Sequence, residues 1–128
     1  MRPPPRILVV DDNDALRENI SEALSLEGYE VEAVASGHLA LEALARDPLP
    51  SVLLVDMMMP GMTGPELLAA VRASPRLAGL RVALVTGQVP AREALPVDAV
   101  LGKPFGVADL LKVIERLLSQ GSRALAST

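Results

Sequence analysis

Five short aliphatic runs alternate with helical patterns along the chain, and this alternation limits the possible folds more than any other feature. The runs have the length of strands and cover Ile7–Val10, Val31–Ala35, Val52–Val55, Val82–Val85 and Val97–Leu101. The first, third and fourth are almost continuous in aliphatic residues, which is typical of strands buried on both faces of a parallel sheet. Repeated βαβ units imply right-handed crossovers, so we expect helices on both faces of a five-stranded sheet.

The connections between these runs carry helical patterns with recognisable ends. The Gly28 that follows the first pattern is a common helix C-terminal signal, and Ser36 is a suitable N-cap for the second. Thr63 and Glu66 have the spacing of a capping box at the start of the third. The four predicted helices cover Asp14–Leu26, Ser36 to about Arg46, Thr63 to about Ala73, and Val107–Leu118.

The composition excludes several classes of protein. A chain of 128 residues that is 50% hydrophobic is long enough for one domain with its own core. The absence of cysteine excludes disulfides, thiolate metal sites and cysteine nucleophiles. With 2% aromatic residues and a net charge of −4, neither base stacking nor duplex binding is expected, so we predict no direct nucleic-acid partner.

The ends of the chain fit a single cytoplasmic domain. The apolar run near the N-terminus is too short for a signal peptide, and no uncharged stretch approaches the roughly 18 residues of a membrane span. We therefore expect a cytoplasmic protein without membrane insertion. Residues 1–5 are predicted to form an N-terminal extension, 6–118 the domain core, and 119–128 a tail. Met1 shortly before the first strand favours a natural start.

Three carboxylates stand directly after predicted strands. Asp11 and Asp12 follow the first run, and Asp56 follows the third. Ligands of open α/β sheets bind beyond the carboxyl ends of the strands at a topological switch point, so adjacent first and third strands would bring these acids together. Packed like charges raise each other's pKa unless a cation joins them. Oxygen ligands without His or Cys favour a hard, partly hydrated ion such as Mg²⁺.

A hydroxyl and an ammonium group occupy the ends of two further strands. Thr86 follows the fourth run and Lys103 the fifth. The lysine and a metal would neutralise phosphoryl oxygens, and the hydroxyl would donate a hydrogen bond. A carboxylate in such a site can act as a nucleophile and form an acyl phosphate. Together the strand ends predict a site for a phosphoryl group.

Four motifs, in order and at strand ends, carry a resemblance that covers nearly the whole chain. They are Val9–Asn13, Leu54–Gly64, Val85–Gly87 and Gly102–Phe105. The chain resembles the CheY-like receiver domain of two-component response regulators. The resemblance implies a flavodoxin-like, doubly wound α/β fold with parallel strand order 2-1-3-4-5.

The resemblance also implies roles for individual residues. Asp56 would be the phosphoacceptor, with Asp12 and Asp56 direct ligands of Mg²⁺, Asp11 acting largely through water, and the backbone carbonyl of Met58 completing the metal site. Methionines in the loop after the third strand are expected to pack rather than to bind a soft metal.

The remaining implications concern the phosphoryl group and the partners. Thr86 and Lys103 would contact the phosphoryl oxygens, and the peptide bond from Lys103 to Pro104 is expected to be cis. The phosphoryl donor would be a histidine kinase or a histidine phosphotransfer protein, and a downstream protein would read the phosphorylated state. The domain would catalyse only its own phosphorylation and slow dephosphorylation, and would not be a turnover enzyme.

Two departures from the family pattern concern the output of the domain. Receivers generally carry Tyr or Phe three residues before the site lysine, where this chain has Val100. Thr86 and Lys103 are also only 17 residues apart, which shortens the helix between the fourth and fifth strands to about 91–95. We therefore expect phosphorylation to change mainly 57–64 and 87–96, and to leave the Val107–Leu118 helix nearly still.

Three alternative functions compete with that of a receiver. A haloacid-dehalogenase-type phosphatase needs a second Asp two residues after the first, where this chain has Met58. A flavodoxin-like flavin carrier binds phosphate after its first strand, where the acids of this chain would repel it. A pseudo-receiver, which binds a partner without being phosphorylated, remains the main alternative although all five key residues are present. The single histidine, His38, is expected to be a solvated helix residue.

Overall fold

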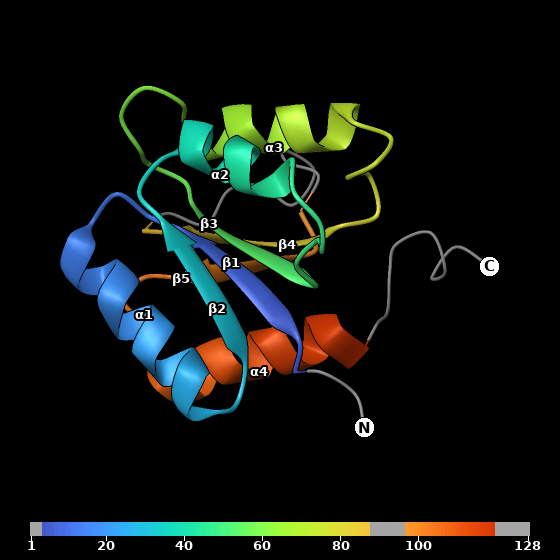
Figure 1. Ribbon diagram of the computed structural model, residues 1–128. Coiled ribbons are helices and arrows are strands. Elements are labelled where there is room, and N and C mark those ends of the chain that lie inside the picture. Colours follow the sequence, from blue (N-terminus) through green and yellow to red (C-terminus); the bar gives the residue numbers. More distant parts are fainter. Residues whose placement is uncertain (1–3, 88–96, 120–128) are drawn as a thin grey trace.

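The computed structural model describes residues 4–87 and 97–119, and it contains one parallel sheet of five strands (Figure 1). The order is β2-β1-β3-β4-β5, with every neighbouring pair parallel, which confirms the predicted fold class and strand order. The strands are β1 (Arg6–Val10), β2 (Glu30–Val34), β3 (Val52–Asp56), β4 (Arg81–Thr86) and β5 (Ala99–Gly102).

Helices cover both faces of the sheet. The four described helices are α1 (Asp14–Leu26), α2 (Gly37–Leu44), α3 (Gly64–Ala73) and α4 (Val107–Ser119). Figure 1 shows α2 and α3 on one side of the sheet and α1 and α4 on the other. Each side has its own buried aliphatic cluster, so the molecule has three layers with two cores.

The alternation of side chains along β3 explains the two cores. All five residues of this strand are buried. Leu53 and Val55 belong to the cluster on the α2–α3 side, whereas Val52 and Leu54 belong to the cluster on the α1–α4 side. Successive residues of a strand point to opposite faces, so the stretch 52–55, which is covered on both faces, is apolar at every position before the strand ends at Asp56. This requirement accounts for the continuous aliphatic run in the sequence.

The predicted helix starts are confirmed. Thr63 and Glu66 form the capping box, with the Thr63 amide donating to the Glu66 carboxylate at 3.0 Å and the Glu66 amide to the Thr63 hydroxyl at 3.2 Å. Ser36 caps α2 by accepting from the Leu39 amide. These caps satisfy amides that have no partner within the helix.

All five strands differ from the predicted runs by one or two residues at one end or both. β2 begins one residue earlier, at Glu30, because the Glu30 amide donates to the Pro5 carbonyl and its carboxylate pairs with Arg6. β5 begins two residues later, at Ala99, because the Asp98 side chain accepts from the Val82 amide. The short helix predicted at about 91–95 lies outside the described residues.

A buried ion network lies at the amino ends of β4 and β5. Asp98 pairs with Arg72 of α3 at 3.1 Å and with Arg81 of β4 at 3.3 Å. Arg72 also donates to the Leu80 carbonyl at 2.7 Å. The three charged side chains are at most 13% exposed, so each depends on the others for compensation of its charge. The network joins α3 to both strands at the end of the sheet opposite the predicted site.

No helix in the described ranges has both the length and the apolar character needed to cross a lipid bilayer.

Candidate functional site

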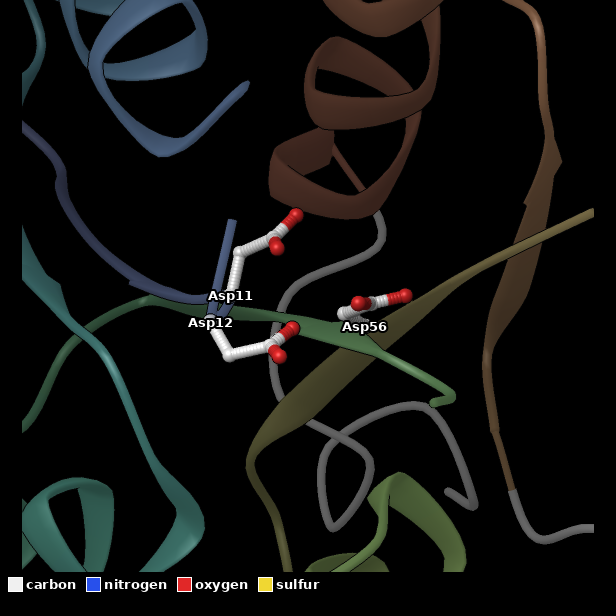
Figure 2. Close-up of side chains that lie close together, drawn as sticks. All are labelled: Asp11, Asp12 and Asp56. Atoms are coloured by element: carbon white, nitrogen blue, oxygen red, sulfur yellow. The ribbon is translucent and has the colours of Figure 1, made fainter. Parts of the chain in front are cut away.

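The sheet topology brings the three predicted acids to one edge. β1 and β3 are neighbours, with Val10 opposite Val55, so their carboxyl ends lie side by side. Asp11 and Asp12 follow β1 directly, and Asp56 is the last residue of β3. One carboxylate oxygen from each acid lies within 4.8 Å of those of the other two, and Figure 2 shows the three side chains gathered together. The predicted convergence is therefore observed.

Burial makes this cluster electrostatically costly. Asp11 and Asp56 are 2% and 4% exposed, whereas Asp12 is exposed. Desolvation raises the pKa of Asp11, and the nearby charges of Asp56 and Asp12 raise it further. A hydrogen bond of 2.9 Å from the Asn13 amide and the charge of Lys103 act in the opposite direction. Crowded acids of this kind are stabilised by additional positive charge.

Lys103 supplies part of that positive charge. Its Nζ lies 3.2 Å from Oδ1 of Asp56. Its amide donates to the Thr86 carbonyl at 2.7 Å, which fixes the end of β5 against the end of β4. The peptide bond between Lys103 and Pro104 is cis, as the resemblance implied. The lysine therefore enters the site from a strand that lies two positions away from β3.

Thr86 lies at the same edge, but its hydroxyl is engaged with a residue that the prediction did not include. Thr86 is buried at the end of β4, and its Oγ1 donates to Sδ of Met57 at 3.2 Å. The sequence signal for this contact is positional, because Met57 directly follows Asp56 and its amide donates to Val85 near the end of β4. The next residue, Met58, has a side chain that is 73% exposed.

The loop after β3 is held tightly against the site. The Gly64 amide donates to the Met57 carbonyl at 3.0 Å. A Cβ atom at Gly64 would lie only 2.6 Å from the Asp56 carbonyl oxygen and 2.8 Å from Cα of Met57, so a side chain cannot be accommodated without displacement. Met59 is buried in the core, and Met62 packs over Gly37. These two methionines serve in packing, as predicted.

The donor chemistry fits a hard divalent cation. The cluster offers carboxylate oxygens only, which suit Mg²⁺ better than a soft transition metal. Three acids face a single nearby ammonium group, so the cluster can accept a dication and gain charge compensation. Asp11, Asp12 and Asp56 are the residues that would hold it.

The fold and the acids together match a known family. The family model of the response regulator receiver domain matches residues 7–115. The chain belongs to the response regulator receiver family. Receiver domains are signalling modules of two-component systems. The match confirms the family predicted from the four motifs.

Curated relatives and solved structures agree with this assignment. The receiver domain is 39% identical over 116 residues to response regulator MprA of Mycobacterium leprae, covering 88% of this chain and 50% of that protein. It is 35% identical over 120 residues to the two-component response regulator ORR11 of Oryza sativa subsp. indica, covering 90% and 82%. The structure of chemotaxis protein CheY4 of Vibrio cholerae aligns with a TM-score of 0.84 at 32% identity, covering 90% of this chain and 99% of that one.

The coverage of these relatives differs in an informative way. The receiver domain spans about half the length of the MprA proteins that it matches. It spans nearly all of the CheY4 chain. The shared region is therefore the receiver domain itself.

Proposed function

We propose that this receiver domain accepts a phosphoryl group on Asp56 in a Mg²⁺-dependent reaction. The donor is a phosphohistidine of a histidine kinase or of a histidine phosphotransfer protein, and a downstream protein reads the phosphorylated state. The observation that carries the proposal is the convergence of three carboxylates within 4.8 Å, with the Lys103 ammonium 3.2 Å from Asp56. Acidic clusters are common, but one that also contains a paired lysine and a neighbouring hydroxyl suits phosphoryl transfer.

The proposed transfer exchanges one bond to phosphorus for another. A carboxylate oxygen of Asp56 attacks the phosphorus atom, the phosphorus–nitrogen bond of the phosphohistidine breaks, and an acyl phosphate forms. The released imidazole nitrogen takes up a proton. Asp56 suits this role because it is the acid of the cluster that pairs with Lys103.

The surrounding residues have separate parts in this proposal. Asp12 and Asp56, with the backbone carbonyl of Met58, would hold Mg²⁺ directly, and Asp11 would act on it largely through water. A bound Mg²⁺ supplies positive charge to the phosphoryl oxygens during transfer. Lys103 balances the remaining negative charge, and the Thr86 hydroxyl donates to a phosphoryl oxygen once the acyl phosphate has formed. The domain acts once on each phosphoryl group and is not a turnover enzyme.

The test uses acetyl phosphate as a small phosphodonor and intact mass as the readout. We expect the wild type to gain one phosphoryl group with Mg²⁺ and none with EDTA. Asp56→Asn should abolish the gain, whereas Asp14→Asn, which changes an exposed acid in the first turn of α1, should leave it unchanged. Equal labelling of Asp56→Asn and wild type would refute the proposal. Absence of labelling in the wild type, with both acetyl phosphate and a phosphorylated histidine protein as donors, would favour a pseudo-receiver.

A further inference from the structure

The turn between β1 and α1 brings two consecutive acids to one cluster. Successive side chains of an extended strand point to opposite faces. Asp11 and Asp12 are consecutive, yet an oxygen of each lies within 4.8 Å of one from Asp56, and Figure 2 shows both side chains extending toward the side of Asp56. The backbone therefore leaves the strand conformation after β1, and it bends at Asp12. The candidate cation site depends on this bend.

Hydrogen bonds reach Asp11 at its amide, its carboxylate and its carbonyl. The amide donates to the Val34 carbonyl of β2 at 3.1 Å, and the carboxylate accepts from the Asn13 amide at 2.9 Å. The carbonyl accepts from Nη1 of Arg17 at 2.9 Å. This last bond acts on the peptide group that joins Asp11 to Asp12. Arg17 therefore contacts the part of the backbone whose orientation sets the directions of the two carboxylates.

The start of α1 directs Arg17 back to this peptide group. Asn13 caps the helix by accepting from the Leu16 amide, so Arg17 lies in its first turn. Helical side chains lean toward the N-terminus of their helix, which brings the guanidinium back to the end of β1. Nη2 of Arg17 also donates to Oδ1 of Asp14 at 2.7 Å. Arg17 is 19% exposed but Asp14 is 81% exposed, so the ion pair itself adds little stability.

We propose that Arg17 is a positioning residue that holds the peptide group between Asp11 and Asp12 in the orientation required for cation binding. This inference rests on the proposed Mg²⁺ site. A hydrogen bond from a charged donor is stronger than one from a neutral donor, so Arg17 favours one orientation of the peptide group. Groups that orient metal ligands without touching the metal change metal affinity by ten-fold or more when they are removed. Arg17 has this effect through the backbone.

The charge of Arg17 makes the competing roles distinguishable by sign. A guanidinium group beside a cation site repels a dication, so a purely electrostatic role predicts that removal of the charge tightens Mg²⁺ binding. A positioning role predicts weaker binding, because release of the peptide group lets the carboxylates of Asp11 and Asp12 move apart. A role confined to folding stability predicts unchanged affinity of the folded domain.

Titration calorimetry of the whole chain with Mg²⁺ measures this sign. Arg17→Met keeps an unbranched apolar side chain but removes the charge and the donors, and we expect about ten-fold weaker binding. Arg17→Lys keeps the charge but loses the two-nitrogen fork that reaches Asp11 and Asp14 together, so we expect a smaller loss.

Two control variants should keep the wild-type affinity for Mg²⁺. Asp14→Asn removes the charge of the exposed partner but leaves the hydrogen bond from Arg17 to the Asp11 carbonyl. Arg116→Met removes an exposed positive charge from the last turn of α4.

A second measurement needs no cation. Hydrogen exchange of the Asn13 amide in the metal-free domain reports the bend, since this amide is bonded to the Asp11 carboxylate. We expect faster exchange in Arg17→Met than in the wild type. Unchanged exchange of the Val9 amide, within β1 between its two neighbouring strands, shows that the sheet is intact.

The outcomes separate this inference from the proposed function. Wild-type or tighter Mg²⁺ binding by Arg17→Met would overturn the positioning role, as would unchanged exchange of its Asn13 amide. Should Arg17→Met fail to fold, the same result with Arg17→Lys overturns it. By contrast, failure of the wild type to bind Mg²⁺ would overturn the Mg²⁺-dependent phosphoacceptor proposal.

Discussion

Lys103 directly follows β5 and Asp56 ends β3, two strands that are not neighbours, yet Nζ of the lysine lies 3.2 Å from Oδ1 of the acid. β4 separates β3 from β5, so the lysine side chain spans the end of β4, where Thr86 lies. The backbone amide of Lys103 also donates a hydrogen bond to the Thr86 carbonyl. Lys103 thus connects the proposed phosphoacceptor to two further strands, and this arrangement determines what its removal should do.

Replacement of Lys103 should leave the fold intact but weaken the response of the domain to a phosphoryl mimic. Lys103→Ala removes a partly exposed side chain, 33% exposed, that fills no part of the core, so the fold should remain intact. With less charge compensation at Asp56, beryllofluoride should bind more weakly and produce smaller spectral changes. Lys112→Ala changes the other lysine, which is exposed on α4, and should have no effect. Wild-type spectral changes in Lys103→Ala would contradict this prediction.

Repulsion among the three acids should lower the folding stability of the metal-free domain. Asp11→Asn keeps an oxygen that can accept from the Asn13 amide but removes a buried charge, so we expect stabilisation by about 1 kcal/mol without Mg²⁺. The same change should weaken Mg²⁺ binding and reduce the thermal stabilisation that Mg²⁺ gives to the wild type. Thermal unfolding with and without Mg²⁺ measures both effects. The exposed Glu18→Gln is the control, and destabilisation of metal-free Asp11→Asn would count against the prediction.

The capping box should make stability depend on acid pH. Hydrogen bonds from the Thr63 amide and hydroxyl lower the pKa of Glu66, so its ionised form is favoured in the folded state. This stabilisation is present above the unfolded pKa, about 4.3, and is lost as the pH falls through the lower folded pKa. Glu66→Gln should therefore be less stable than wild type at pH 7, with the difference disappearing toward pH 3. Denaturant unfolding at both pH values measures it.

The matched control for that titration is Glu42→Gln on the exposed side of α2. A stability difference between Glu66→Gln and wild type that does not change with pH would show that the charge of Glu66 has no part in the cap.

Gly61 in the loop after β3 and Gly64 at the start of α3 should respond differently to replacement by alanine. Gly64→Ala places a Cβ atom against the Asp56 carbonyl, so it should cost about 1–3 kcal/mol and slow phosphorylation by moving the site. Gly61 has a φ of +81° and open space around it, so Gly61→Ala should cost about 1 kcal/mol of backbone strain and leave phosphorylation unchanged. Denaturant unfolding and acetyl phosphate labelling distinguish the two. Normal labelling of folded Gly64→Ala would contradict the tight packing.

The position of Val100 predicts a limited conformational response. Val100 of β5 pairs with Leu84 of β4. It lacks the aromatic ring that most receivers have at this position, and its branched side chain is restricted in χ1, so it moves little between rotamers. We expect beryllofluoride to alter hydrogen exchange around Met57–Gly64 and to leave α4 unchanged. A ligand shifts an equilibrium only through contacts that differ between the two states. Large protection changes along α4, or dimers driven by beryllofluoride, would show that the output uses another route.

The sequence predicted the parts of the molecule that depend on local pattern. Strands buried on both faces require continuous aliphatic runs, and the acids that follow such runs lie at the carboxyl edge of the sheet. Asp11, Asp12 and Asp56 could therefore be placed together on the condition that the first and third strands are neighbours, an order that the family resemblance implied. The capping residues Thr63 and Glu66 were predictable because both partners lie within one turn.

The parts that escaped prediction depend on contacts between distant segments. Arg72 lies on α3, Arg81 begins β4 and Asp98 precedes β5, and no local pattern distinguishes them from solvated surface charges. The hydrogen bond between Thr86 and Met57 joins residues 29 positions apart, and it required the register of β3 and β4. The start of β5 was predicted two residues too early for the same reason. The Val82 amide donates to the Asp98 side chain instead of to a backbone carbonyl, and this contact could not be read from the sequence.

The buried ion network at the amino ends of β4 and β5 has a consequence for how this domain can be altered. Arg72, Arg81 and Asp98 join α3 to β4 and to the start of β5, whereas the three acids at the carboxyl ends form the candidate cation site. The sheet keeps the two sets of charges a full strand length apart, about 17–20 Å, which is well beyond the roughly 7–10 Å within which substitutions usually influence each other. Substitutions that tune cation affinity at one end should thus combine additively with substitutions that tune folding stability at the other.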